Sequence, residues 1–166
     1  MRRLNFFPTP YPDECFYSIF CRYYVRSGIS SPKTAAEMFF GCGMSLLAST
    51  VYFPRKLERL DHWVSPDSGI TGEKLICEHT TYPYHSISHT KDVYQQMENV
   101  IQDGIPEDGI ASLVRRMISK SKYVSVGQYL RYCPECTRED IRKCGEAYWH
   151  RLPQMPGVML CPKHGC

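Results

Sequence analysis

Two short motifs near the end of the chain constrain its fold more than any other feature of the sequence. They are CPEC at 133–136 and CPKH at 161–164. In each motif two residues separate the ligand-type side chains, so both can converge on one ion, and the proline after the first cysteine restricts φ in the turn. A tetrahedral zinc site takes four such ligands and then has no open position for catalysis. The spacing therefore predicts one structural zinc site formed by Cys133, Cys136, Cys161 and His164.

Other assignments of the ligand-type side chains stay open. A CxxC pair alone also occurs in redox-active thiols, but a second motif at zinc-ribbon spacing favours zinc. His150 lies between the motifs and is the main rival of His164, although Trp149-His150 also fits packing. Cys144 does not fit the motif spacing and is at best a substitute ligand, and Cys166 is the least certain thiol.

Composition indicates a globular protein with reduced thiols. The 166 residues include nine cysteines, and no apolar run approaches the length of a membrane span. The basic start of the chain breaks on Pro8, Pro10 and Pro12, so it does not read as a secretory signal. An odd number of cysteines without an export signal favours the cytosol, with some thiols on metal, over a disulfide framework.

Positive charge gathers toward the C-terminus. Residues 1–114 carry 10 Lys and Arg against 13 Asp and Glu, whereas residues 115–166 carry 10 against 4. This surplus is compatible with a polyanion partner and equally with an ordinary solvated surface. The candidate contacts to double-stranded DNA are Arg115, Arg116, Lys120, Lys122, Arg138, Arg142 and Lys143.

Hydrophobic periodicity predicts a mainly α-helical region before the motifs. Asp13 is expected to cap a first helix that ends at Gly28. Its apolar face repeats at helical spacing through Phe16, Ile19, Phe20, Tyr23 and Tyr24. A second helix is expected from Ser31-Pro32 to Gly41. Two short helices around a glycine-containing turn are compatible with a DNA-reading helix-turn-helix, although most such pairs only pack.

The sequence pattern in the middle of the chain predicts further helices, followed by short strands. Helices are expected at 54–64, from Thr71 to a stop at Pro83, and around 93–101 and 110–118, with strands at 123–126 and 129–132 framing the zinc site. His79, His85 and His89 are a weak second metal candidate, because no acidic or thiol ligand repeats with them. The predicted organisation is a helical N-terminal region, 1–122, followed by a zinc-ribbon or zinc-finger module, 123–166.

Three stretches of the sequence resemble the N-terminal domain of the TniQ/TnsD family, the target-selection proteins of transposons related to the Tn-seven group. The first comprises PYPDE at 10–14, Ser18, Arg22, GI at 28–29 and SP at 31–32. The second is EHT at 78–80 with Pro83. The third comprises RYCPEC at 131–136, GEAYW at 145–149, LP at 152–153 and CPKHG at 161–165. The match spans nearly the whole chain, and the zinc segment is its most specific part.

The resemblance implies a protein that selects a target and is not itself the recombinase. Family members recognise DNA directly or a guide-RNA complex, and pass the choice to an AAA+ ATPase that recruits the transposase. The zinc ligand set carries over onto Cys133, Cys136, Cys161 and His164. Members of the TnsD branch continue well past the position of Cys166, so the resemblance also implies an N-terminal fragment or a short family member.

Two functional hypotheses follow from these patterns together with what the resemblance implies about partners. In the first, the protein binds target DNA through its basic residues and recruits the AAA+ regulator. In the second, it is a zinc-stabilised adaptor that docks on the ATPase or on a guide-RNA complex and binds DNA weakly. An enzyme is the least favoured class, because no carboxylate pair, Ser-His-Asp order or phosphate-cradling loop has supporting context.

Overall fold

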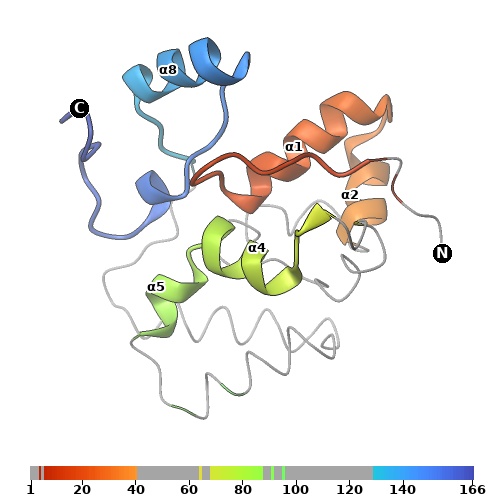
Figure 1. Cartoon of the computed structure of the whole chain (residues 1–166), viewed down its shortest axis with the longest axis horizontal. Coiled ribbons are helices and arrows are strands. Elements are labelled where there is room, and N and C mark those ends of the chain that lie inside the picture. Colours follow the sequence, from red (N-terminus) through yellow and green to blue (C-terminus); the bar gives the residue numbers. More distant parts are fainter. Residues whose placement is uncertain are drawn as a thin grey trace.

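A computed structural model describes residues 4, 6–40, 64, 68–87, 91, 95 and 129–166 (Figure 1). Several sequence predictions fall outside these residues. They are most of the helix at 54–64, the helices around 93–101 and 110–118, the strand at 123–126, the side chains of His85 and His89, and the basic residues Arg115, Arg116, Lys120 and Lys122.

The described residues are mainly helical, as predicted. The α-helices are α1 (Phe16–Ser27), α2 (Pro32–Phe40), α4 (Gly72–His79), α5 (Tyr82–Ser86) and α8 (Pro134–Cys144), followed by the 3-10 turn η4 (Leu152–Gln154). Within the described ranges there is no sheet, and the β-type pairing is an isolated antiparallel bridge between Glu14 and His150. None of the helices in the same ranges has both the length and the apolar character that crossing a membrane requires.

Helix α1 begins later than the sequence predicted. Cys15 occupies the N-cap position, and Asp13 lies before the helix with φ 56°. The Asp13 carboxylate accepts hydrogen bonds from Arg151 and from the backbone N–H of Leu152, so it is not available as a helix cap. The end of α1 is as predicted, because Gly28 adopts the left-handed conformation, φ 69°, that terminates helices.

The caps of α2 and α4 confirm the predicted helix starts. The backbone N–H of Thr34 donates to Ser31 Oγ at 3.3 Å, and the N–H of Lys74 donates to Thr71 Oγ1 at 3.2 Å. The predicted stop at Pro83 is wrong. Helix α4 ends at His79, and Pro83 lies in the first turn of α5, where the missing N–H of proline costs no helical hydrogen bond.

The hydrophobic core lies between α1, α2 and α4. Phe16, Ile19, Phe20 and Tyr23 of α1 are buried as the periodicity predicted, while Tyr24 is only half-buried. The other buried members are Leu4, Ala35, Ala36, Val64, Leu75, Ile76 and Tyr82. In Figure 1, α8 and the C-terminal segment lie to one side of this core, beside α1 and the N-terminal lead.

The strand predicted at 129–132 does not form. Instead, the buried Gln154 side chain accepts a hydrogen bond from the backbone N–H of Arg131 at 3.0 Å and donates to its carbonyl at 2.7 Å. One amide side chain thus satisfies the backbone groups that a neighbouring strand would pair with. The described part of the C-terminal module is therefore built from a helix and loops.

Candidate metal centre

The four predicted ligand residues come together at the N-terminal end of α8. One ligand-type atom from each of Cys133, Cys136, Cys161 and His164 lies within 4.8 Å of all the others. Cys133 Sγ is 3.3 Å from His164 Nδ1, and Cys136 Sγ is 3.7 Å from Cys161 Sγ. Three sulfurs and one imidazole nitrogen at this spacing can hold a metal ion, and the donor set fits a closed tetrahedral zinc site.

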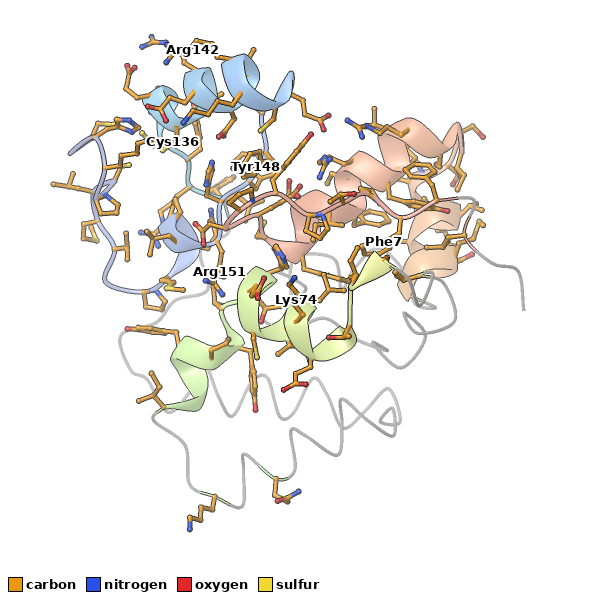
Figure 2. The ribbon with its side chains drawn as sticks, viewed as in Figure 1. Phe7, Lys74, Cys136, Arg142, Tyr148 and Arg151 are labelled. Carbon is orange, nitrogen blue, oxygen red and sulfur yellow. The ribbon has the colours of Figure 1, made fainter. Side chains whose placement is uncertain are left out.

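The first motif is positioned by the start of α8. Cys133 is the N-cap residue, and its Sγ accepts from the backbone N–H of Cys136 at 3.4 Å, while Pro134 occupies the first helical position. The N-terminal end of a helix carries a partial positive charge, which stabilises nearby thiolates. Figure 2 shows Cys136 on the side of α8 that faces the C-terminal tail.

Glu139 supports the cluster from the outside, and the sequence analysis missed it. Its Oε1 lies 3.3 Å from His164 Nε2, which leaves Nδ1 directed at the sulfurs. The hydrogen bond from Lys163, with help from Lys143, lowers the pKa of Glu139 to about 2, so it is a carboxylate at neutral pH. The sequence could have indicated this role, because Glu139 lies three residues after Cys136 and therefore on the same face of the helix.

Of the three remaining ligand candidates, Cys166 touches the cluster, whereas His150 and Cys144 do not. His150 is not part of the cluster: its Nε2 lies 2.8 Å from Asp140 Oδ2, and its ring stacks on Tyr148. Cys144 is the last residue of α8, at the other end of the helix from the cluster. Cys166 Sγ lies 3.3 Å from Cys133 Sγ, so this thiol touches the cluster.

The structure does not support His79 as a ligand of the second metal site that the sequence suggested. Its Nδ1 lies 2.7 Å from the carbonyl oxygen of Glu14, and burial lowers the pKa of its ring. A neutral imidazole with its proton on Nδ1 satisfies this contact as a donor to the carbonyl. Within the described part of the chain, the cluster at α8 is the one group of three or more metal-type side chains.

A second set of polar contacts, which we call the seam, joins α1 to the C-terminal module. Its centre is Arg22, whose Nη1 lies 2.8 Å from Glu14 Oε2 and whose Nε lies 2.8 Å from Glu146 Oε1. Ser18 Oγ donates to the other oxygen of Glu14 at 2.8 Å. Glu14 is fully buried and Arg22 nearly so, and the guanidinium therefore compensates the Glu14 carboxylate away from bulk water, whereas the Glu146 side chain is partly exposed.

Backbone pairing extends the seam along the N-terminal lead. The N–H of Cys15 donates to the Trp149 carbonyl, and the N–H of Arg151 donates to the Asp13 carbonyl, both at 2.7 Å. The Arg151 side chain also reaches the carbonyls of Cys77 and Thr80 at the C-terminal end of α4, as its position between the elements in Figure 2 indicates. The seam therefore ties residues before α1, the end of α4 and the C-terminal module to one another.

The two carboxyl groups that pair with Arg22, Glu14 and Glu146, have pKa values shifted in opposite directions. Burial raises the pKa of Glu14 despite hydrogen bonds from Tyr11, Ser18 and Arg22. Burial also opposes ionisation of Glu146, but the contacts with Arg22 and Tyr11 outweigh it and lower the pKa of Glu146. The more exposed end of the network is thus the better place for a negative charge.

The described basic candidates for DNA contact lie on α8. Arg138, Arg142 and Lys143 are exposed. Arg138 forms an ion pair with Glu135, and Lys143 lies 3.5 Å from Glu139. Arg142 extends from the outer side of α8 (Figure 2), with Nε 3.4 Å from the Arg138 carbonyl.

An apolar pocket of about 270 Å³ opens next to the base of α8. It is lined by Tyr132, Thr137, Ala147, Tyr148 and Trp149. Tyr132 is 64% exposed and meets Trp149 edge to face, with ring centroids 6.1 Å apart. Aromatic surface that stays accessible in this way is a feature of many interaction sites.

Comparison with known proteins gives two matches. The TniQ family model matches residues 5–166. The chain is also 28% identical over 159 residues to the Transposon Tn7 transposition protein TnsD of Escherichia coli, an alignment that covers 96% of this chain and 30% of that protein. The chain therefore spans less than a third of the length of this relative.

Proposed function

The chain belongs to the TniQ family, and from this membership we propose that it selects the target site in DNA transposition, with a C-terminal module, 123–166, that zinc stabilises. The observation that carries the proposal is the meeting of the three family-like stretches in one place. Residues from 10–22, 78–80 and 145–152 contact one another in the seam, and the Cys3His cluster gathers parts of the third stretch, 133–136 and 161–164, at the start of α8. The name of the relative, a transposition protein, supports the same process.

In this proposal the zinc ion has a structural role. Four protein ligands close its coordination shell, so no position remains for an activated water. The ion links the start of α8 to the 161–164 motif, and the seam links the module to the helical region, 1–122. The metal therefore holds a recognition surface in shape and takes no part in a chemical step.

For the recognition itself we favour contact with double-stranded DNA. The basic residues Arg138, Arg142 and Lys143 stand together on the exposed part of α8, and Arg115, Arg116, Lys120 and Lys122 precede the module in the sequence. Phosphate contacts from such residues would hold the protein on the duplex. The bound protein would then recruit an AAA+ transposition regulator.

A protein-interaction adaptor is the second candidate, and two observations favour it. Arg138 and Lys143 already have carboxylate neighbours in Glu135 and Glu139, which reduces the positive field of α8. The pocket beside α8 is apolar and aromatic, as the centres of protein interfaces are. Such an adaptor would dock on the ATPase or on a guide-RNA complex.

A salt titration of duplex-DNA binding by this chain distinguishes the two candidates. We expect binding to a candidate insertion site to weaken steeply with salt, and Arg142→Glu to reduce the salt slope by about one or two units, because one phosphate contact becomes repulsive. The matched control is Lys33→Glu on α2, an exposed basic residue far from α8 in the sequence.

Each result of this titration has a defined meaning. Binding that prefers the insertion site over a scrambled duplex supports DNA recognition by this part of the protein. Absence of binding at low salt contradicts it, and a pull-down with the AAA+ ATPase of the same transposon then tests the adaptor. Failure of both assays would overturn the proposed function.

A further inference from the structure

A fifth metal-type side chain, one more than a tetrahedral ion needs, borders the four-residue cluster at the start of α8. The fifth is Cys166, whose Sγ lies 3.3 Å from Cys133 Sγ. Cys133 Sγ lies at the same distance, 3.3 Å, from His164 Nδ1. A thiol and an imidazole thus approach the same ligand sulfur, although zinc in a structural site binds four groups.

The backbone of the second motif brings Cys166 to this place. The N–H of Gly165 donates to the Cys161 carbonyl at 2.7 Å, and the N–H of Cys161 donates to the Cys166 carbonyl at 2.7 Å. Gly165 has φ 70°, a left-handed conformation that turns the chain back on itself. Cys161, His164 and Cys166 therefore belong to one closed turn.

Among the four cluster ligands, His164 is the one that Cys166 is best placed to replace. The two residues lie in the same turn, and imidazole is the one uncharged ligand of the set. His164 is held in place by Glu139, whose carboxylate also meets Lys163 and Lys143. These partners are partly or largely exposed, and exposed ion pairs contribute little energy. The contact that keeps His164 on the metal is thus open to competition.

We propose that Cys166 is a reserve ligand of the metal centre, able to take the coordination position of His164. The site then holds its ion with three thiolates and one imidazole, or with four thiolates. The exchange makes the centre one unit more negative, because a thiolate replaces a neutral ring, and it releases His164 beside Lys163. This inference rests on the metal site of the proposed function and adds a second ligand set to it.

Cobalt(II) reports the ligand set directly, because its thiolate charge-transfer absorption grows with the number of bound sulfurs. The chain, kept reduced by a phosphine, is titrated with Co²⁺ as wild type, H164A, and H164A/C166S. We expect H164A to bind Co²⁺ with stronger charge-transfer absorption than the wild type. H164A/C166S should bind at least about tenfold more weakly than H164A, because even the loss of an outer-shell partner has effects of this size.

The matched control is H164A/C144S, since Cys144 is at the opposite end of α8. It should behave as H164A does. Equal affinity and equal spectra for H164A and H164A/C166S would overturn the inference while leaving the metal site intact. Absence of Co²⁺ binding by the wild type would instead overturn the metal site itself.

If H164A does not fold, a second pair of variants still tests the inference. E139Q frees His164 from its carboxylate and keeps every ligand. We expect E139Q to show stronger thiolate-to-cobalt absorption than E139Q/C166S at saturating Co²⁺. Identical spectra for these two variants would contradict a reserve role for Cys166.

Discussion

The seam and the metal centre hold the same C-terminal module by different physical means. The seam joins groups far apart in the chain, such as Arg22 and Glu146, which are 124 residues apart. The metal centre joins groups from one segment, and Cys133 and His164 are 31 residues apart. The centre can therefore form within its own segment, whereas the seam forms only when α1 is already folded onto the core.

The two regions also differ in what they contribute to stability. A structural zinc site supplies folding free energy directly, because the unfolded chain holds no preformed site. A buried ion pair gives a small net gain, since the desolvation of both charges nearly offsets their attraction. Loss of either member alone is nevertheless costly. The metal centre is thus expected to stabilise the module, and the seam to specify where the module sits.

Loss of one metal ligand should have the largest effect. In Cys136→Ser the module should lose its ion and unfold over 129–166, because structural zinc contributes about 10 kcal/mol or more in finger peptides. Helices α1, α2 and α4 should keep their protection, since their core contains no ligand. Metal analysis and hydrogen exchange measure both effects, with exposed Cys77→Ser as the control. Unchanged metal content and melting in Cys136→Ser would contradict the assigned site.

Breaking the seam should have the next largest effect and should spare the metal. Arg22→Met leaves the buried Glu14 carboxyl without its cation, which costs about 3–5 kcal/mol. Glu14→Gln combined with Arg22→Met should cost less, because no buried charge is then left unpaired. Denaturant unfolding gives these free energies, and the metal content should remain at the wild-type value. A double variant as unstable as the sum of the single variants would show that the two side chains are not coupled.

A smaller effect is expected from the outer support of the metal. Glu139→Gln weakens the contact with His164 Nε2 and should lower metal affinity by about tenfold, the low end of the range for an outer-shell partner, because the contact is partly exposed; α8 should stay folded. Glu135→Gln is the matched control, because Glu135 also lies on α8 but contacts Arg138 and not the cluster. A competition titration with a chelator measures both variants. Equal affinities would remove Glu139 from the site.

The smallest effect should be a dependence of the seam on pH. Burial lowers the pKa of His79 below its ordinary value of 6.5, so the folded state holds the neutral ring. The unfolded chain therefore binds a proton at higher pH, and stability should fall as the pH drops below 6.5 toward the folded-state pKa.

Comparison with His79→Gln isolates this contribution, because acid weakens metal binding equally in both proteins. Thermal melting should show a wild-type curve that loses more stability with acid than the variant does. Parallel curves would mean that His79 is not held neutral in the folded state.

Local patterns predicted the parts of the fold that depend on neighbours in the chain. The apolar face of α1, its end at Gly28, and the caps Ser31 and Thr71 follow from short-range rules and were confirmed, except that Tyr24 is only half-buried. The end of α4 was predicted at Pro83 and lies instead at His79. The predictions failed where a distant group takes over a local role. Asp13 does not cap α1 because it binds Arg151, and 129–132 form no strand because Gln154 pairs with Arg131.

The sequence by itself determined the set of metal-type residues, since ligand spacing within a tight turn is a local property. It also determined the family, because the matching motifs are short and contiguous. Only the tertiary structure decided that His150 pairs with Asp140 while His164 faces the sulfurs, and that Arg22 bridges Glu14 and Glu146. Those choices depend on contacts between segments far apart in the chain, and such contacts leave no periodic signal in the sequence.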